Sequence, residues 1–363
     1  MEKEKLREFY QNNIYGMWRC GEDISYELLG PDKDTEEKPE GFAAFLKVTG
    51  GDVIRITVSK DGRSSSFLVH AYLPDEKEKT YTGPSPFIIC MHPIPAADLA
   101  IKKGYAHLVM TASEIASDDT EHKGTFYDLY SYGDDNDEQT GVLMAWAWGA
   151  SKILDAVYAG LGNDLSINPD LSLVTGVSRW GKATAVCGAF DERIKMTIPA
   201  CSGAGGLALF DFISEGKTYD MTQVGGPADY TYGKNEPLGC LQSDAERGWF
   251  NDNFLKYKKP EDIPVSQSML PVLGVSDTRY CFIIAACMGE DWVNAPAMWE
   301  CYKQADSLLK PENLDSHLMV HFHKEGHAVI DEDMELITDL FDHIAFGKPL
   351  HVPFESLKTT VFE

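Results

Sequence analysis

A serine stands where an apolar run changes into a helix-like run, in the segment GVSRWGKATAVCGAF. The run LSLVTGVS (171–178) predicts a strand, and GKATAVCGAF (181–190) predicts a helix. A serine on a sharp turn between strand and helix is a nucleophile elbow, in which the first helical N–H groups face a developing oxyanion. The generic pattern is G-x-S-x-G; here Gly176 precedes Ser178, and the second glycine, Gly181, comes one position late. A plain Gly-Ser turn between strand and helix is the alternative interpretation.

A histidine that could take the proton of Ser178 follows the last strand-like run. The segment LMVHFHKEGHAVIDED contains His321, His323 and His327. The first two alternate with apolar residues, as strand side chains do, and no carboxylate or cysteine partner for a metal site is evident, so we expect no metal. His327 follows a Glu-Gly turn, and in α/β-type serine hydrolases the histidine comes last in the chain. We therefore predict that His327 is the general base.

A carboxylate that orients this histidine is expected after the preceding strand. The apolar run YCFIIAACM (280–288) is followed by Gly289-Glu290-Asp291-Trp292. Either acid could hold an imidazole in one orientation, and either could instead cap the next helix. We predict Asp291 as the acid, with Glu290 as its substitute.

The elements that must position these residues alternate along the chain. An opening hairpin, 54–59 and 66–73, is joined by an Asp-Gly turn. Further strands are expected at 86–92, 106–112, 171–178, 194–200, 280–288 and 318–324, and helices at 141–161, 181–190, 295–309 and 331–346. This order predicts an α/β-hydrolase fold, a three-layer sandwich in which a mostly parallel central sheet of eight strands carries helices on both faces. Residues 1–363 are expected to form a single domain with insertions at about 113–140 and 203–270.

Composition limits the partners of the chain. With 32 Lys and Arg against 57 Asp and Glu, the net charge is −25, which disfavours binding to nucleic acid or to an anionic membrane. The start, MEKEKLREFYQNN, lacks the apolar region of a signal peptide, so we expect a cytoplasmic protein, or a secreted protein or domain without its leader. Eight cysteines without a CxxC pair favour free thiols over disulfides or zinc.

Three segments give the chain a family resemblance, which extends over roughly residues 85–346 because WFNDNF, VSQSMLPVL, GEDWVNAP and KEGH have weaker counterparts. GVSRWGK resembles the G-[CV]-S-R-x-G-K elbow of carbohydrate esterase family 15, the glucuronoyl esterases, and this accounts for the late glycine. FDERIKMTIPACSGAGG and GVLMAWAWGASKILDAV resemble the segments that flank this elbow in the family. The resemblance implies an α/β-hydrolase without metal or cofactor. It also implies a substrate, the ester between 4-O-methyl-glucuronic acid on xylan, or on a xylo-oligosaccharide, and a lignin alcohol.

The same resemblance implies roles for individual residues. Ser178 would be the nucleophile and His327 the base, and Arg179 would help to bind the oxyanion. The residues implied to bind the uronate are Lys182 and Glu246 at its hydroxyls, Gln242 less securely, and Trp292 packed against the ring. A charged donor and a carboxylate can bind sugar hydroxyls, and an aromatic face packs on the C–H groups of the ring.

One position departs from the family pattern I-P-x-E-S-G, because Cys201 stands where many members have a catalytic glutamate. A thiol cannot orient an imidazole as a carboxylate does, so the acid is expected from the Glu290–Asp291 segment, as in some bacterial relatives. Three alternatives stay open: an acetylxylan esterase or another carbohydrate esterase on the same scaffold, an inactive carbohydrate-binding protein, and a hydrolase that uses Cys201 itself.

Overall fold

A nine-stranded sheet forms the centre of the computed structural model, which describes residues 2–33, 48–77 and 79–363. The strands lie in the order β1-β2-β3-β5-β4-β6-β7-β10-β11. Their bounds are Asp23–Pro31 (β1), Asp52–Lys60 (β2), Arg63–Tyr72 (β3), Ser85–Cys90 (β4), Ala106–Met110 (β5), Ile167–Val177 (β6), Met196–Ala200 (β7), Tyr280–Met288 (β10) and Leu318–Glu325 (β11). A separate small hairpin joins Thr218–Tyr219 (β8) to Tyr230–Thr231 (β9).

The sheet is antiparallel at one side and parallel over the rest. β1, β2, β3 and β5 pair antiparallel, whereas β5-β4-β6-β7-β10-β11 is a continuous parallel series. The predicted α/β-hydrolase fold is therefore confirmed, with one correction, since the sheet has nine strands and not eight. The additional strand is β1, an edge strand whose burial varies irregularly between exposed and intermediate and which lacks a continuous apolar run.

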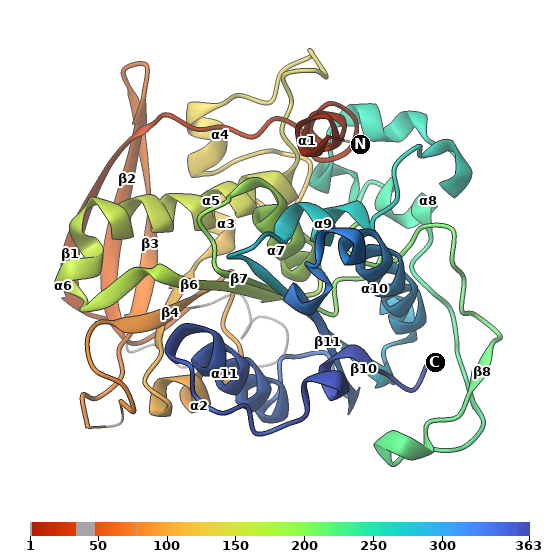
Figure 1. Cartoon of the computed structure of the whole chain (residues 1–363). Helices are drawn as coiled ribbons and strands as arrows, with labels where there is room; N and C mark the ends of the chain where they lie inside the picture. The colour runs from red at the N-terminus through yellow and green to blue at the C-terminus, as the bar shows by residue number, and fades with distance from the viewer. Residues whose placement is uncertain (1, 34–47, 78) are drawn as a thin grey trace.

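Helices cover both faces of the sheet (Figure 1). Ala97–Lys102 (α2) and Asp331–Phe346 (α11) lie on one face; Val142–Ala156 (α5), Arg179–Phe190 (α7), Met269–Gly274 (α9) and Ala295–Leu309 (α10) lie on the other. The remaining helices are Lys3–Tyr10 (α1), Ala112–Ile115 (α3), Thr125–Leu129 (α4), Gly162–Asp164 (α6) and Leu238–Leu241 (α8). α5 is buried on nearly all sides, which explains its apolar sequence.

Because β5, β4, β6, β7, β10 and β11 run parallel, their carboxyl ends meet at one edge of the sheet. The elbow, the Glu290–Asp291 segment and the loop with His327 follow β6, β10 and β11 and therefore gather there. The segments 113–140 and 203–270 consist mainly of turns and short helices.

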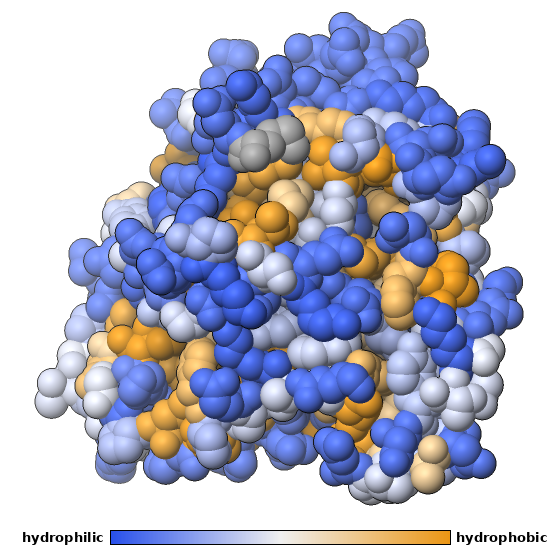
Figure 2. Space-filling view, turned by 45° about the vertical axis from the view of Figure 1, so that its right-hand side comes forward, coloured by the Kyte–Doolittle hydropathy of each residue, from blue (hydrophilic) through white to orange (hydrophobic). Residues whose placement is uncertain are grey.

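The face of the molecule seen in Figure 2 is mostly polar. Figure 2 shows a largely hydrophilic face with separate apolar patches between the polar side chains. Within the described ranges, no helix is both long and apolar enough to cross a membrane. All eight cysteines fall in these ranges and are free thiols.

Candidate active site

Ser178 sits on a strained turn between β6 and α7. Its backbone angles, φ 63° and ψ −125°, lie in a region that side-chain-bearing residues rarely adopt. The turn requires glycine both at position 176 and at position 181, because a side chain at either position would collide with the backbone. A Cβ on Gly176 would lie 2.7 Å from the carbonyl oxygen of Trp180, and a Cβ on Gly181 would lie 2.3 Å from that of Ala200 in β7. The late glycine is therefore the position at which α7 packs against β7.

Ser178 and His327 face the same cavity of about 180 Å³. Its lining consists of His92, Pro95, Val177, Ser178, Arg179, Trp180, His327 and Ala328. The first turn of α7 therefore opens onto the space in which an ester carbonyl would stand beside the serine. The N–H groups of that turn and the helix dipole favour negative charge there.

Glu290, rather than Asp291, is the carboxylate beside the histidine. Its Oε2 lies 2.9 Å from Nδ1 of His327, which leaves Nε2 for the serine. Asp291 points elsewhere, because it accepts hydrogen bonds from the Tyr230 hydroxyl at 2.7 Å and from the Gly233 N–H at 2.8 Å. The prediction of Asp291 as the acid beside His327 is therefore corrected to its substitute, Glu290. Asp291 instead connects the β8–β9 hairpin to the segment that holds Glu290.

Arg179, which lines this cavity, is held by residues of the segments 113–140 and 203–270. Its guanidinium lies 2.5 Å from Asp118 Oδ2 and 5.1 Å from the ring centre of Trp249. The indole N–H of Trp249 donates to the other oxygen of Asp118 at 2.7 Å. Asp118 thus orients the arginine and the tryptophan together.

Lys182 forms a buried ion pair behind the elbow. Its ammonium lies 2.8 Å from Glu236 Oε2 and donates to the carbonyl oxygens of Ser202 at 2.9 Å and Ala204 at 2.6 Å. An ammonium has three N–H donors, and these three acceptors occupy them. To bind a sugar hydroxyl directly, Lys182 would have to exchange one of these protein partners.

Glu246 and Gln242 differ in whether their polar side-chain atoms already have hydrogen-bond partners in the protein. Oε2 of Glu246 is buried and has no hydrogen-bond partner among the residues that the structure describes. Burial raises the pKa of this carboxyl and the charge of Glu236 raises it further, whereas Lys182, a hydrogen bond from the Cys240 thiol, and Arg179 oppose the rise. Gln242 instead donates its amide to the carbonyl oxygens of Phe254 and Tyr257, at 3.0 and 2.7 Å. The amide N–H groups of Gln242 therefore hold its own loop in place.

Trp292 is 38% exposed and follows directly after the acidic pair. The Lys234 ammonium lies 5.6 Å from its ring centre, and its carbonyl oxygen accepts the N–H of Glu236 at 2.9 Å. An exposed indole at this edge offers an apolar aromatic face to a ligand.

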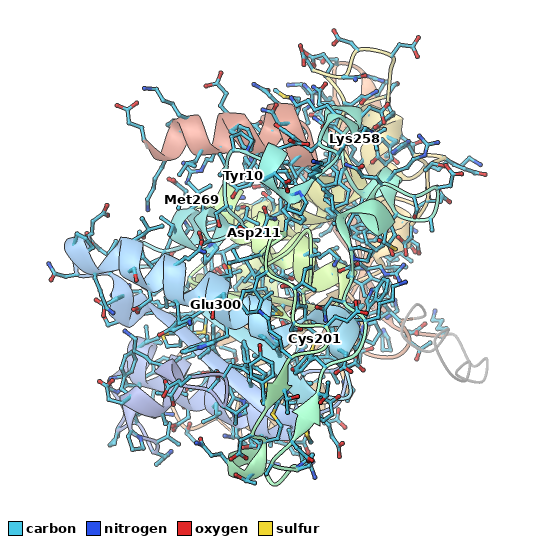
Figure 3. All side chains as sticks on the ribbon, turned by 90° about the vertical axis from the view of Figure 1, so that its right-hand side faces the viewer. Tyr10, Cys201, Asp211, Lys258, Met269 and Glu300 are labelled. Atoms are coloured by element: carbon cyan, nitrogen blue, oxygen red, sulfur yellow. The ribbon has the colours of Figure 1, made fainter. Side chains whose placement is uncertain are left out.

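Cys201, labelled in Figure 3, follows β7 and is buried. Burial and the charge of Asp333 raise the pKa of its thiol to about 12. The thiolate is the nucleophilic form, so Cys201 is not poised to attack an ester.

His92, Glu236 and Asp118 are site residues that sequence reasoning missed. His92 follows β4 at the carboxyl edge, and its Nε2 accepts the N–H of Val177 at 3.0 Å. Burial lowers the pKa of His92 to about 4, so it is neutral near pH 7. The position of His92 just after a buried strand is a sequence feature that predicts a place at the carboxyl edge of the sheet. Glu236 and Asp118 lie in irregular segments, where the sequence pattern predicts no such position.

A larger cavity, about 520 Å³, lies at the other end of α7. Its charged side chains pair with one another, as Arg7 does with Glu192 and Arg193 with Asp191. The cavity at Ser178 therefore remains the candidate active site, although it is smaller.

Known sequences resemble this chain over most of its length. The family model for glucuronyl esterases of fungi matches residues 56–310. The chain is 43% identical over 359 residues to a multidomain esterase from Ruminococcus flavefaciens, which covers 97% of this chain and 44% of the relative. It is 36% identical over 248 residues to a 4-O-methyl-glucuronoyl methylesterase from Podospora anserina, which covers 66% of this chain and 45% of the relative. The chain thus spans less than half the length of these two relatives.

Solved structures share the whole architecture. A carbohydrate esterase family 15 glucuronoyl esterase from Caldicellulosiruptor kristjansonii superposes with a TM-score of 0.83 at 28% identity, covering 99% of this chain and 87% of that one. The glucuronoyl esterase of Sporotrichum thermophile, solved with methyl 4-O-methyl-β-D-glucopyranuronate, shares the fold with a TM-score of 0.70 at 20% identity, covering 96% and 82%. Because the family match spans well over half of its residues, the chain belongs to the glucuronoyl esterases of carbohydrate esterase family 15.

Proposed function

We propose that this chain is a serine esterase that cleaves glucuronoyl esters through an acyl-enzyme. The observation that carries the proposal is the Ser178 elbow facing the same cavity as a histidine whose Nδ1 lies 2.9 Å from Glu290. The names of the relatives, a glucuronoyl esterase and a 4-O-methyl-glucuronoyl methylesterase, support a uronate as the acyl group. The chain would be of the type whose acid follows β10.

The proposed reaction proceeds in two steps. Ser178 Oγ attacks the ester carbonyl while His327 takes its proton, and the N–H groups at the start of α7 together with Arg179 stabilise the oxyanion. His327 then gives the proton to the leaving alcohol. Water, activated by the same histidine, hydrolyses the glucuronoyl ester of Ser178 and releases the uronate.

Selectivity for a uronate over an acetyl group would come from the buried oxygen of Glu246 and the exposed ring of Trp292. An acetyl group offers no ring and no hydroxyls to these side chains. In xylan or xylo-oligosaccharides, the ester of 4-O-methyl-glucuronic acid with a lignin alcohol would be the natural substrate.

The test compares hydrolysis of benzyl D-glucuronate with hydrolysis of benzyl acetate, which has the same leaving group, and of acetylated xylan by the same preparation. We expect a kcat/KM at least about 100-fold higher for the glucuronate ester, because the charged hydrogen bond to Glu246 and the packing on Trp292 are lost with the acetyl group. A preference for acetylated xylan would instead assign the chain to the acetylxylan esterases. No labelling of Ser178 by a fluorophosphonate would point to an inactive binding protein.

A further inference from the structure

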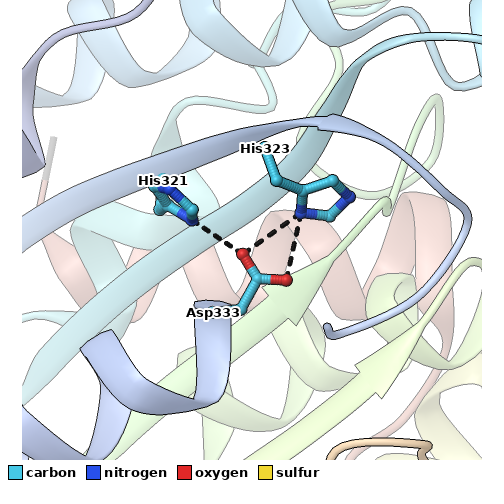
Figure 4. A group of neighbouring side chains, drawn as sticks. All are labelled: His321, His323 and Asp333. Atoms are coloured by element: carbon cyan, nitrogen blue, oxygen red, sulfur yellow. Dashed lines mark hydrogen bonds and ion pairs between the residues drawn. The ribbon is translucent and has the colours of Figure 1, made fainter. Parts of the chain in front are cut away.

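Two histidines of β11 share one buried carboxylate beneath the loop that carries His327 (Figure 4). His321 Nδ1 lies 2.7 Å from Oδ1 of Asp333, and His323 Nδ1 lies 3.0 Å from Oδ2 of the same side chain. Asp333 stands in the first turn of α11 and is fully buried, and its Oδ2 also accepts the N–H of Ile330 at 2.8 Å. The expectation that these histidines have no carboxylate partner is therefore corrected.

The second nitrogen of His323 reaches the loop itself. Its Nε2 lies 3.0 Å from the carbonyl oxygen of Gly326, the residue before His327. A carbonyl oxygen only accepts, and an ionised carboxylate only accepts, so both ring nitrogens of His323 must donate. The ring is therefore a buried imidazolium that joins the start of α11 to the loop after β11.

The surroundings stabilise this charge. The pKa of His323 is raised by Asp333, by the carbonyl of Gly326 and by Glu332, although burial opposes the rise. The pKa of Asp333 is lowered by both histidines against the effect of its burial. Four titratable groups surround the ring of His323. They are Asp333 and Glu332 on α11, His321 on β11, and the thiol of Cys201 just after β7, whose pKa the charge of Asp333 raises.

We propose that His323 is a positioning residue: by bridging Asp333 and the Gly326 carbonyl, its protonated ring holds the loop so that His327 faces Ser178 and Glu290. The inference rests on the proposed function of His327 as the base. The alternative use of the cluster, metal binding, is disfavoured by the contacts themselves, because the ring nitrogens already meet the carboxylate directly at hydrogen-bond distances. An error of about 1 Å in the place of a catalytic group can lower a rate about 100-fold.

Two amide substitutions separate the two contacts of His323. In His323→Asn, the amide nitrogen replaces Nδ1 and keeps the bond to Asp333 but loses the one to Gly326. In His323→Gln, the amide nitrogen replaces Nε2 and keeps the bond to Gly326. We expect the rate at which a fluorophosphonate labels Ser178 to fall about 10- to 100-fold in His323→Asn and less than about 5-fold in His323→Gln.

The matched control is His321→Asn, on the same strand and against the same carboxylate, but without a contact to Gly326. It should label at close to the wild-type rate. Thermal unfolding of each variant identifies any that fails to fold, and labelling is compared only among folded proteins. Equal rates in folded His323→Asn and wild type, or an equal loss in His321→Asn, would overturn the proposal.

Protonation supplies a readout that a merely structural histidine would not give. We expect the ¹⁵N resonances of the His323 ring at pH 7 to show two protonated nitrogens. The wild-type labelling rate should fall at high pH, because the neutral ring keeps its remaining proton on Nδ1 beside Asp333 and no longer donates to Gly326. In His323→Gln this alkaline fall should disappear. A neutral ring, or one zinc ion per chain in the purified protein, would contradict the proposal. Labelling by a fluorophosphonate does not depend on the acyl group of the substrate. A wild type that is labelled at Ser178 but does not hydrolyse glucuronate esters would therefore refute only the proposed function.

Discussion

The two adjacent carboxylates that follow β10 have different hydrogen-bond partners. Glu290 meets His327, whereas Asp291 accepts hydrogen bonds from Tyr230 and Gly233. The turn Asp291–Val293 is a short 3-10 helix, in which neighbouring side chains point in different directions. A choice between the two acids therefore depends on the turn and not on the residue type.

Substitution of each acid by its amide tests this division. Glu290→Gln should lower kcat by about 10³- to 10⁴-fold with little change in KM, because the amide no longer stabilises the imidazolium of His327. Asp291→Asn should lower kcat less than about 10-fold and act mainly on the melting temperature. Steady-state kinetics on benzyl glucuronate measure both, and the reverse order of effects would return the acid to Asp291.

Glu246 should determine affinity for the uronate. Glu246→Gln removes a charged acceptor for the sugar hydroxyls, which corresponds to about 1.5–3 kcal/mol, or about 10- to 100-fold in kcat/KM on a glucuronate ester. Hydrolysis of p-nitrophenyl acetate should stay unchanged. Gln242→Ala is the control: it should lower the melting temperature and leave KM on the glucuronate unaltered. An equal loss on both esters in Glu246→Gln would mean that the residue does not contact the sugar.

At the scale of elements, the elbow depends on the contact between α7 and β7. Gly181→Ala would place a Cβ 2.3 Å from the carbonyl oxygen of Ala200, so the helix must move away from the sheet. We expect a loss of about 3 kcal/mol in unfolding free energy and a slower labelling of Ser178. Gly274→Ala in α9, where the nearest atoms are 3.7 Å away, should be tolerated. Denaturant unfolding compares the two; equal effects would show that this close approach does not matter.

Much of this architecture is predictable because burial leaves a periodic signal. The parallel strands are apolar runs, since both of their faces are covered, and the predicted helices 295–309 and 331–346 match α10 and α11 at both ends. The predicted helix 141–161 ends as α5 at Ala156 and continues as a π-helical turn, in which Gly160 has a φ of 136°. That change depends on local geometry that the sequence pattern does not show.

The remaining parts lack such a signal. β1 is an edge strand of mixed burial, so its sequence resembles a loop. Asp118 and Glu236 come from irregular segments and meet Arg179 and Lys182 only through the tertiary fold. Asp333 lies in the first turn of a helix, where an acid is expected for capping alone.

At the scale of the whole molecule, the net charge is −25, and the cations at the site do not offset it locally. Arg179 and Lys182 are each paired with a carboxylate, so they do not form an unbalanced positive spot beside the serine. In the proposed reaction a neutral ester would enter this surface without repulsion, whereas the uronate product would be an anion on a strongly acidic protein. Charge at this scale would therefore favour release of the product.

The buried histidines predict how stability depends on pH. Burial lowers the pKa of His107 to about 3 and that of His92 to about 4. Both stay neutral in the folded protein while the unfolded chain binds protons below about pH 6.5. The stability they contribute is present above that pH and is lost as the pH falls toward 4, at about 1.4 kcal/mol per pH unit for each group.

His107→Leu should therefore reduce the slope of unfolding free energy against pH between 6 and 4. His107 contacts Cys90 between β4 and β5, away from the cavity at Ser178, so catalysis is a separate readout. Urea unfolding at several pH values measures the slope. An unchanged slope in the variant would mean that His107 takes up its proton in the folded state.

The most direct measurement of the central claim is the hydrolysis of benzyl glucuronate by the wild type and by Ser178→Ala, each confirmed as folded. The triad at the elbow predicts turnover in the wild type and a loss of at least about 10³-fold in kcat in the variant. Turnover in Ser178→Ala at the wild-type rate would contradict the assignment of Ser178 as the nucleophile.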